Sequence, residues 1–282
     1  PNAKAVIDLA SEQTGLDIPA LCFEENDKLN ITEYTQICML AVEAAIYQAI
    51  IDKGITPDVT AGLSLGEYGA LIASGAMTMA DAFAVVRKRG IYMQEAVPTG
   101  GAMTAVLGLD PQVIEDICKK TADETNSVVS VANYNCPGQI VITGEKAAVD
   151  TAAAACSEAG AKRCVPLKVS GPFHSAMLKG AGEKLADALE SVEIHDIKVP
   201  YITNVTADYV KSPADVKDYL TQQVSSSVRW QQTIERLIAD GADEFVEIGP
   251  GRSLSGFMRK INRDVKVVNI DKLEDFEKYV NR

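Results

Sequence analysis

Histidine and closely spaced cysteine, the residues on which most metal centres depend, are scarce in this sequence. There are two histidines, and the six cysteines include no C-x-x-C pair. This spacing offers no set of metal ligands, so we expect neither a metal site nor a disulfide framework. Free thiols in a reducing cytoplasm are the expected state of the cysteines.

Positive charge and long apolar runs are also lacking. The chain has 27 basic and 39 acidic side chains, and its net charge of −12 argues against nucleic acid as the main partner. No apolar run approaches the roughly 20 residues that cross a bilayer, and no secretory signal is recognisable. With 282 residues, 47% of them hydrophobic, we expect a cytoplasmic protein of one or two domains, without membrane association.

The most informative stretch that is present runs from Gly62 to Leu71. Its first residues have the G-x-S-x-G pattern of a nucleophile elbow, with Ser64 at the centre. We expect a short apolar strand over Val59–Leu63 and a helix after the elbow. The flanking glycines permit a sharp turn that displays the serine hydroxyl at the positive end of the helix. The pattern alone is weak, and the alternative is a serine that caps the helix.

A serine nucleophile needs a base, and only the two histidines are candidates. His174 lies in a loop that leads into a helix, where catalytic groups are commonly displayed. A capping or loop-packing role is the alternative. His195 lies in a polar stretch and is expected to be an ordinary surface residue. No acid has to lie between Ser64 and His174, since a backbone or amide carbonyl can also orient an imidazole.

Arg89 interrupts the apolar face of a helix expected over 79–96, on the side that carries Val86 and Met93. A guanidinium in such a position must find an anion. The anion is either an internal carboxylate or the carboxylate of a substrate, which guanidinium can bind with two hydrogen bonds. Glu67 invites a general-acid role, but a carboxylate in the first turn of a helix also suits the helix dipole, and we expect it to be structural.

The order of the predicted helices and strands changes within the chain. Between 102 and 170 the pattern predicts the order β-α-β-β-α-β, which is typical of a ferredoxin-like unit. On both sides of this segment helices alternate with short apolar strands. The arrangement suggests a small domain inserted into a larger α/β domain.

Several short segments, taken together and in order, resemble the malonyl-CoA:acyl carrier protein transacylases, which load malonyl groups in fatty acid synthesis. Each segment is modest alone, but the set is specific and covers nearly the whole chain. The segments are Thr32–Gln36, Gly62–Leu71, Arg89–Gln94, Asn133–Gln139, Gly171–Ser175, Val228–Trp230 and Glu247–Gly251.

The resemblance implies a fold of class α/β with two subdomains. An α/β-hydrolase-like catalytic subdomain with a parallel sheet would comprise 1–101 and 171–282. A ferredoxin-like subdomain would comprise 102–170, in agreement with the change in the predicted order.

The resemblance also implies catalytic roles. Ser64 would be the nucleophile, His174 the base, and Arg89 the residue that holds the malonyl carboxylate. Gln223 is implied to orient the histidine in place of an acid, although Gln222 lies beside it.

Further roles concern the substrate. The backbone N–H of Leu65 is implied to be one oxyanion donor, and Asn133 to line the acyl pocket. Ser175, after the histidine, resembles the malonyl-selecting form of the motif rather than the methylmalonyl form. Leu63 departs from the family, which often has histidine there, but this position is not the base.

The larger departure is that this sequence does not show the family's opening strand and its G-Q-G-x-Q loop. In the family, this loop supplies the rest of the oxyanion hole. The sequence enters a helical pattern soon after Pro1. We expect the natural protein to be longer, because losing one oxyanion donor costs about 2.7–4 kcal/mol of transition-state stabilisation. Losing a core parallel strand would also leave its neighbours unpaired.

The expected reaction is a ping-pong transfer of malonyl from malonyl-CoA, through a malonyl-serine, to the phosphopantetheine thiol of acyl carrier protein. We expect a monomer that needs no metal or redox cofactor. One alternative is a serine esterase or thioesterase on the same fold. Another is an inactive module that binds acyl carrier protein. Basic residues are expected to form a docking patch for the acidic carrier, the candidates being Lys168, Lys179, Lys184, Arg252, Arg259 and Lys260.

Overall fold

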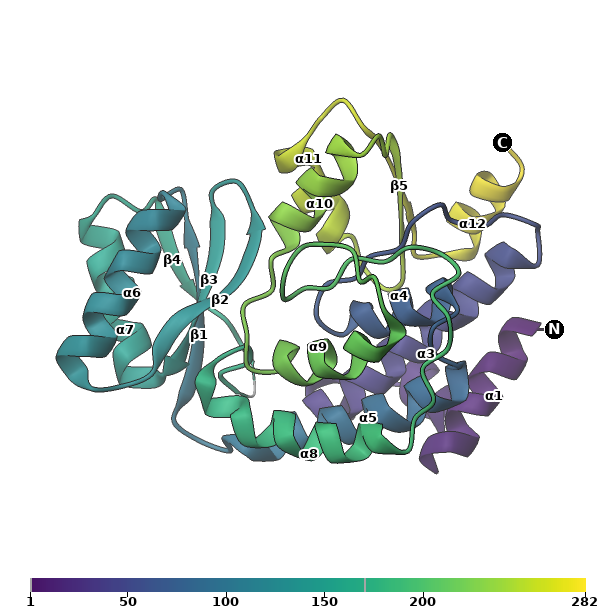
Figure 1. The fold of residues 1–282 in the computed structure, drawn as a ribbon, viewed down its shortest axis with the longest axis horizontal. Coiled ribbons are helices and arrows are strands. Elements are labelled where there is room, and N and C mark those ends of the chain that lie inside the picture. Colours follow the sequence, from purple (N-terminus) through teal and green to yellow (C-terminus); the bar gives the residue numbers. More distant parts are fainter. Residues whose placement is uncertain (1, 170) are drawn as a thin grey trace.

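A computed structural model describes residues 2–169 and 171–282 and shows two parts side by side (Figure 1). At one end of the molecule lies a sheet backed by two helices. The rest is built mainly of helices, with little sheet. The predicted α/β class and the ferredoxin-like unit are confirmed. The exact boundaries of the two subdomains stay a prediction. Ser170, the last residue of the predicted insert, lies outside the described residues.

The first part of the chain is helical. Its helices are α1 (Asn2–Thr14), α2 (Ile18–Phe23), η1 (Lys28–Asn30), α3 (Thr32–Ile51), α4 (Gly66–Ser74) and α5 (Met79–Ala96). Helix α3 lies at the centre of the core between α1 and α5, and its residues Ile37, Leu40 and Ala41 are buried. A helix surrounded by protein needs apolar residues on more than one face, which explains its composition.

By length and composition α3 is the one helix among the described residues that could cross a membrane. It carries Glu33 and Glu43, and it packs against α1 and α5 in the core. A core helix of this kind passes the same test, so the finding is weak evidence for a membrane span.

The second part has the predicted ferredoxin-like order of elements. They are β1 (Gly101–Leu107), α6 (Pro111–Thr125), β2 (Val129–Cys136), β3 (Gln139–Glu145), α7 (Lys146–Glu158) and β4 (Arg163–Pro166). The strands form one antiparallel sheet in the order β2-β3-β1-β4. Alternation along β1 sends Val106 toward α6 and α7, and Ala105 to the opposite face, where it packs with Phe173. The open face of this sheet therefore supports the loop that carries His174.

The last part returns to the helical body. It contains η2 (Ala176–Leu178), α8 (Lys179–Glu190), η3 (Pro213–Asp215), α9 (Val216–Gln223), α10 (Trp230–Ala239), β5 (Glu244–Ile248), α11 (Ser253–Ile261), β6 (Lys266–Ile270) and α12 (Leu273–Val280). Strands β5 and β6 are parallel, with Val246 opposite Val268.

The predicted parallel sheet of the large subdomain is less extensive than expected. Residues 59–63 form no strand, and in the described chain their parallel pairing is reduced to a bridge between Thr60 and Tyr201. On this edge Thr60 N–H donates to Pro200 O, and Ile202 N–H donates to Thr60 O. The other edge faces a cavity, so residues 59–63 have no second strand beside them in the part of the chain that the structure describes.

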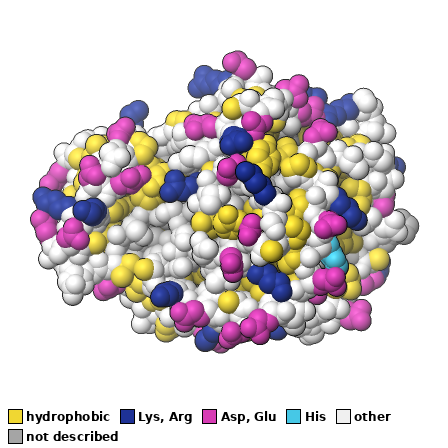
Figure 2. Space-filling view, in the orientation of Figure 1, with side chains coloured by type: hydrophobic (Ala, Val, Ile, Leu, Met, Phe, Trp, Pro, Cys, Tyr) yellow, Lys and Arg dark blue, Asp and Glu magenta, His cyan; other side chains and the backbone are white. Residues whose placement is uncertain are grey.

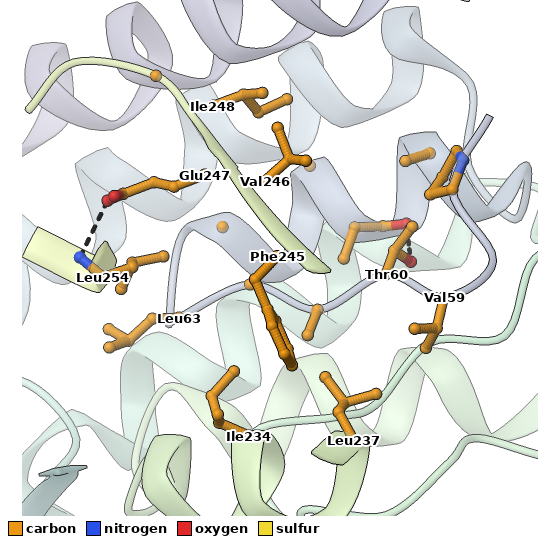
Figure 3. A pocket seen from close by; sticks show the side chains of 18 of the residues that line it. Val59, Thr60, Leu63, Ile234, Leu237, Phe245, Val246, Glu247, Ile248 and Leu254 are labelled. Atoms are coloured by element: carbon orange, nitrogen blue, oxygen red, sulfur yellow. Dashed lines mark hydrogen bonds between the residues drawn. The ribbon is translucent and has the colours of Figure 1, made fainter. Parts of the chain in front are cut away.

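This cavity, of about 1510 Å³, separates residues 59–63 from β5. Figure 3 shows the side chain of Phe245 from β5 between Leu63 and Val59 in this view, directed toward Ile234 and Leu237 of α10. The lining is largely apolar. Leu65 and Asn133 also line it, so the cavity reaches the back of the serine elbow.

Candidate active site

The predicted elbow is a strained turn immediately before α4. Ser64 has a φ of 53°, a left-handed conformation that costs a non-glycine residue about 1–3 kcal/mol. The steric requirement for glycine falls on Gly62, since a Cβ there would collide with the carbonyl of Gly66. Gly66 itself has open space around it. Of the two glycines predicted to permit the turn, only Gly62 is therefore demanded by packing.

His174 lies directly against the nucleophile. Its Nε2 is 2.8 Å from Ser64 Oγ, and its Nδ1 is 2.8 Å from the backbone O of Gln223. Because a carbonyl oxygen can only accept, Nδ1 carries the proton and Nε2 offers its lone pair to the serine O–H. Burial, followed by the nearby Arg89 guanidinium, lowers the pKa of His174 to about 4. The imidazole is thus neutral near pH 7 and able to take a proton.

This pKa predicts the acid limb of the pH profile. We expect kcat/KM to stay level as pH falls through 6.5 and to decline only toward pH 4, where His174 gains a proton. Because the folded pKa lies below the unfolded one, the folded state binds fewer protons in this window, so stability also falls as pH drops from about 6.5 to about 4. Initial rates after brief exposure to each pH separate the two effects. A limb centred near pH 6.5 would contradict the buried, neutral histidine.

Arg89 is fully buried, with 1% of its surface exposed, although it is a charged residue. Its Nη2 donates to Ser64 Oγ at 3.1 Å and its Nη1 to Gln36 Oε1 at 2.5 Å. In the described chain no carboxylate lies within salt-bridge distance, and Nε has no hydrogen-bond partner. Burial lowers the pKa of Arg89, while Tyr68 and Glu67 oppose that shift. Of the two anions considered for Arg89, a directly paired internal carboxylate is therefore not found.

Gln223 contributes two different groups to the site. Its backbone carbonyl, not its side chain, contacts His174. Its side-chain Oε1 accepts from Arg89 Nη2 at 3.0 Å, and its Nε2 donates to Glu67 Oε2 at 2.6 Å. The adjacent Gln222 is exposed, so the structure distinguishes between the two glutamines.

Glu67 lies in the first turn of α4, and its carboxyl group is fully buried. Its Oε2 also acts outside this helix, because it accepts hydrogen bonds from Gln223 Nε2 and from the backbone N–H of Asn204. Burial raises the pKa of Glu67, while these donors, Thr203 and Arg89 oppose the shift. The contacts agree with the structural role that we predicted.

Glu67→Ala is expected to lower the free energy of unfolding by about 2–4 kcal/mol, because two buried N–H donors would lose their acceptor. Urea denaturation of the variant measures this loss. The matched control is Glu235→Ala, which removes an exposed carboxylate on α10. Equal changes in the two variants would show that the buried hydrogen bonds add nothing to stability.

The three remaining predicted residues surround the elbow at different distances. Leu65 precedes α4, and no acceptor for its N–H is found among the described residues. Asn133 lies on β2 next to a bulge and lines the cavity behind Leu65. Ser175 is buried, and its hydroxyl donates to Pro172 O at 2.7 Å, so it closes the loop that bears His174. The oxyanion role of Leu65 and the substrate roles of Asn133 and Ser175 stay predictions.

His195 lies away from the site, as predicted. Its side chain is 39% exposed and stands 3.7 Å from Glu193. The six candidate basic residues are all exposed, and Lys260 spans from α11 to Gln139 on β3. On the face shown in Figure 2, basic side chains are interspersed with acidic ones. A docking patch on these residues stays a prediction.

Two residues of the site were not singled out from the sequence. Gln36, on α3, accepts a hydrogen bond from Arg89, and Asn204 contacts the elbow through both groups of its amide. Gln36 is a polar residue among the buried apolar residues of α3, such as Ile37, which is the same kind of signal that identified Arg89. Asn204 follows the buried segment 201–203, and a polar residue at the end of such a segment is a weaker signal.

A strained serine beside a neutral histidine, next to a buried guanidinium, is the arrangement of a serine acyl-transfer enzyme. A family model described as the acyl transferase domain matches residues 4–270. The chain belongs to this family of acyltransferases.

The comparisons also give individual relatives. A protein of Bacillus subtilis (strain 168) named malonyl CoA-acyl carrier protein transacylase is 45% identical over 98% of this chain and 88% of its own. The protein of that name in Staphylococcus aureus (strain MW2) is 42% identical over 97% of this chain and 89% of its own.

Solved structures of malonyl transacylases have the same fold as this chain. The structure of MCAT from Streptococcus pneumoniae superimposes with a TM-score of 0.95 at 45% identity, covering 99% of this chain and 91% of that one. A malonyl-transacylase in complex with a holo type II PKS acyl-carrier protein has a TM-score of 0.95 at 38% identity, covering 99% of this chain and 91% of that one.

Proposed function

We propose that this acyltransferase moves a malonyl group from malonyl-CoA to the phosphopantetheine thiol of acyl carrier protein, as in fatty acid synthesis. The carrying observation is Arg89: a buried guanidinium 3.1 Å from Ser64 Oγ without a carboxylate partner in the described chain. A charge left in this state is poorly compensated. The free carboxylate of a malonyl thioester supplies the missing anion at the reacting position.

The first half-reaction uses Ser64 and His174. Nε2 of the neutral histidine takes the hydroxyl proton as Oγ attacks the thioester carbonyl, and the resulting imidazolium is held through Nδ1–H by the Gln223 carbonyl. The Leu65 N–H stabilises the oxyanion. Collapse of the tetrahedral intermediate expels CoA, to which His174 returns the proton, and leaves malonyl-Ser64.

The second half-reaction reverses these steps. His174 takes the proton of the phosphopantetheine thiol, the thiolate attacks malonyl-Ser64, and the serine oxygen leaves with the proton from His174. Nucleophile and base both come from this chain, so we propose that no metal or redox cofactor takes part. Arg89 holds the malonyl carboxylate throughout and selects against acetyl groups.

The partner and cellular setting are part of the same proposal. Similarity to a malonyl-transacylase found in complex with an acyl-carrier protein supports acyl carrier protein as the acceptor. The net charge of −12 means that an acidic carrier would have to dock on a local basic surface, such as that around Lys260. We propose a cytoplasmic monomer.

Intact-mass spectrometry after treatment with malonyl-CoA tests the proposal. We expect a stable malonyl adduct, located on Ser64 by peptide mapping, that disappears when holo acyl carrier protein is added and reappears on the carrier. Rapid release of free malonate without the carrier would indicate an esterase or thioesterase. Binding of the carrier without any adduct would indicate an inactive binding module.

A further inference from the structure

We propose that Asn204 is a positioning residue for acyl transfer. Its side-chain amide clamps the backbone of the elbow, so that the N–H of Leu65, rather than that of Ser64, is left for the oxyanion. The reaction in which this matters rests on the proposed function. The clamp itself rests only on contacts around the elbow.

Both groups of one buried amide are used on the elbow. Asn204 Oδ1 accepts from Ser64 N–H at 2.5 Å, and Nδ2 donates to Gly62 O at 2.6 Å. The residue is 1% exposed, so water does not compete for these groups. The amide offers an acceptor and a donor in one fixed plane, here to the backbone on both sides of Leu63.

The two clamped groups have no hydrogen-bond partner within the described turn itself. Gly66 N–H donates to Leu63 O, and Glu67 N–H donates to Ser64 O, which starts the first turn of α4. The carbonyl of Gly62 and the N–H of Ser64 have no such backbone partner in the described chain. Buried backbone groups must be paired, and Asn204 pairs both.

The clamp acts on catalysis through the conformation of Ser64. Its φ of 53° is unfavourable for serine, and a turn without the clamp would relax toward negative φ. Such a change would move Oγ relative to His174 Nε2, which is now 2.8 Å away. It would also release Ser64 N–H and turn Leu65 N–H away from the position of the oxyanion.

Asn204 is itself held on both sides of its backbone. Its N–H donates to Glu67 Oε2 at 3.1 Å, and its carbonyl accepts from Arg229 N–H at 3.1 Å. Glu67 therefore connects the clamp to Gln223 and, through it, to Arg89. A group fixed in this way can hold a strained turn without moving to accommodate it.

The test compares Asn204→Ala with Asn269→Ala. The amide of Asn269, on β6, also donates to a backbone carbonyl, that of Gly251 at 2.8 Å, and in the described chain it makes no hydrogen bond to Ser64 or His174. Four quantities are measured for each: kcat and KM with malonyl-CoA and holo acyl carrier protein, the rate of Ser64 labelling by a fluorophosphonate, and the free energy of unfolding in urea. The fluorophosphonate reacts with an activated serine and needs no malonyl recognition.

For Asn204→Ala we expect kcat and the labelling rate to fall roughly 10- to 100-fold, by weakened oxyanion stabilisation, with KM for malonyl-CoA within about twofold. Asn269→Ala should leave kcat, KM and the labelling rate equal to those of the parent chain, even if its free energy of unfolding falls. Asn204→Asp, which keeps an acceptor for Ser64 N–H but loses the donor to Gly62 O, should also slow labelling and serves if the alanine variant does not fold.

Unchanged kcat and labelling per folded molecule in the Asn204 variants would overturn the proposal, as would an equal loss in Asn269→Ala. Slow labelling in the Asn204 variants, with no malonyl transfer by the parent chain, would support the clamp and overturn the proposed substrate instead.

Discussion

Ser64→Ala is expected to abolish the malonyl adduct and to lower kcat by about 10⁴- to 10⁶-fold, since the Ser64 hydroxyl is the nucleophile candidate that lies 2.8 Å from His174 Nε2. The loss should appear in kcat with little change in stability, because alanine removes only the oxygen. Intact-mass spectrometry and initial rates with malonyl-CoA and holo acyl carrier protein measure it.

The matched control for this variant is Ser74→Ala, at the end of α4, the helix that follows Ser64. Its buried hydroxyl donates to Leu71 O at 2.9 Å and takes no part in the site. The adduct should form normally in this control. Transfer that persists in Ser64→Ala would assign the nucleophile to a different residue.

Arg89→Ala is expected to change which acyl group the enzyme uses. Truncating one partner of a buried charge pair costs about 2–5 kcal/mol, so kcat/KM for malonyl-CoA should fall roughly 30- to 3,000-fold. Acetyl-CoA carries no free carboxylate on its acyl group for Arg89 to bind. Its kcat/KM should therefore fall far less. Competition between the two substrates, followed by mass spectrometry of the acyl-Ser64, measures the ratio directly.

Arg87→Ala is the control for packing, because this neighbouring arginine of α5 pairs with Glu33 at 2.8 Å and lies outside the site. It should lower stability without altering the malonyl-to-acetyl ratio. Arg89→Ala should also move the acid limb of kcat/KM to higher pH, since the guanidinium helps to lower the pKa of His174. Equal losses for malonyl and acetyl substrates would make Arg89 a structural residue.

The contacts that the sequence predicted are those that follow from local pattern. Ser64 is identified by its glycines, and Arg89 by its position on an apolar helix face. His174 was the better placed of two histidines. The structure brings the three together at hydrogen-bond distance, although the pattern could not say that Arg89 Nη2 would contact the serine oxygen itself.

The contacts that pattern missed use backbone groups or distant residues. The partner of His174 is the main-chain carbonyl of Gln223, and a main-chain group has no sequence signature. Asn204 reaches Ser64 across 140 positions of the chain, and Gln36 reaches Arg89 across 53. Only the packing of α3, α5 and the segment after α8 brings these groups to one point.

The parallel sheet also separates what local sequence pattern predicts from what depends on residues remote in sequence. The apolar segment 59–63 has the composition of a strand, but a parallel strand depends on neighbours that are remote in sequence. Here one neighbour is present at Tyr201, and the opposite edge faces a cavity. The antiparallel ferredoxin-like unit was predicted more completely, because its strands are close in sequence and its helices cover only one face.

By itself the sequence determined the chemistry that this chain can offer: one displayed serine, one suitable histidine, and one arginine on an apolar face. These are local properties, set by residue type and by periods of two and 3.6 residues. The tertiary structure decided the state in which each group is held. Burial keeps His174 neutral. Hydrogen bonds to Gln36, Ser64 and Gln223 hold Arg89, with no carboxylate at salt-bridge distance in the described chain. The amide of Asn204 contacts the backbone on both sides of Leu63 in the strained turn. Desolvation and hydrogen-bond geometry depend on everything that surrounds a group, and no segment of sequence contains its own surroundings.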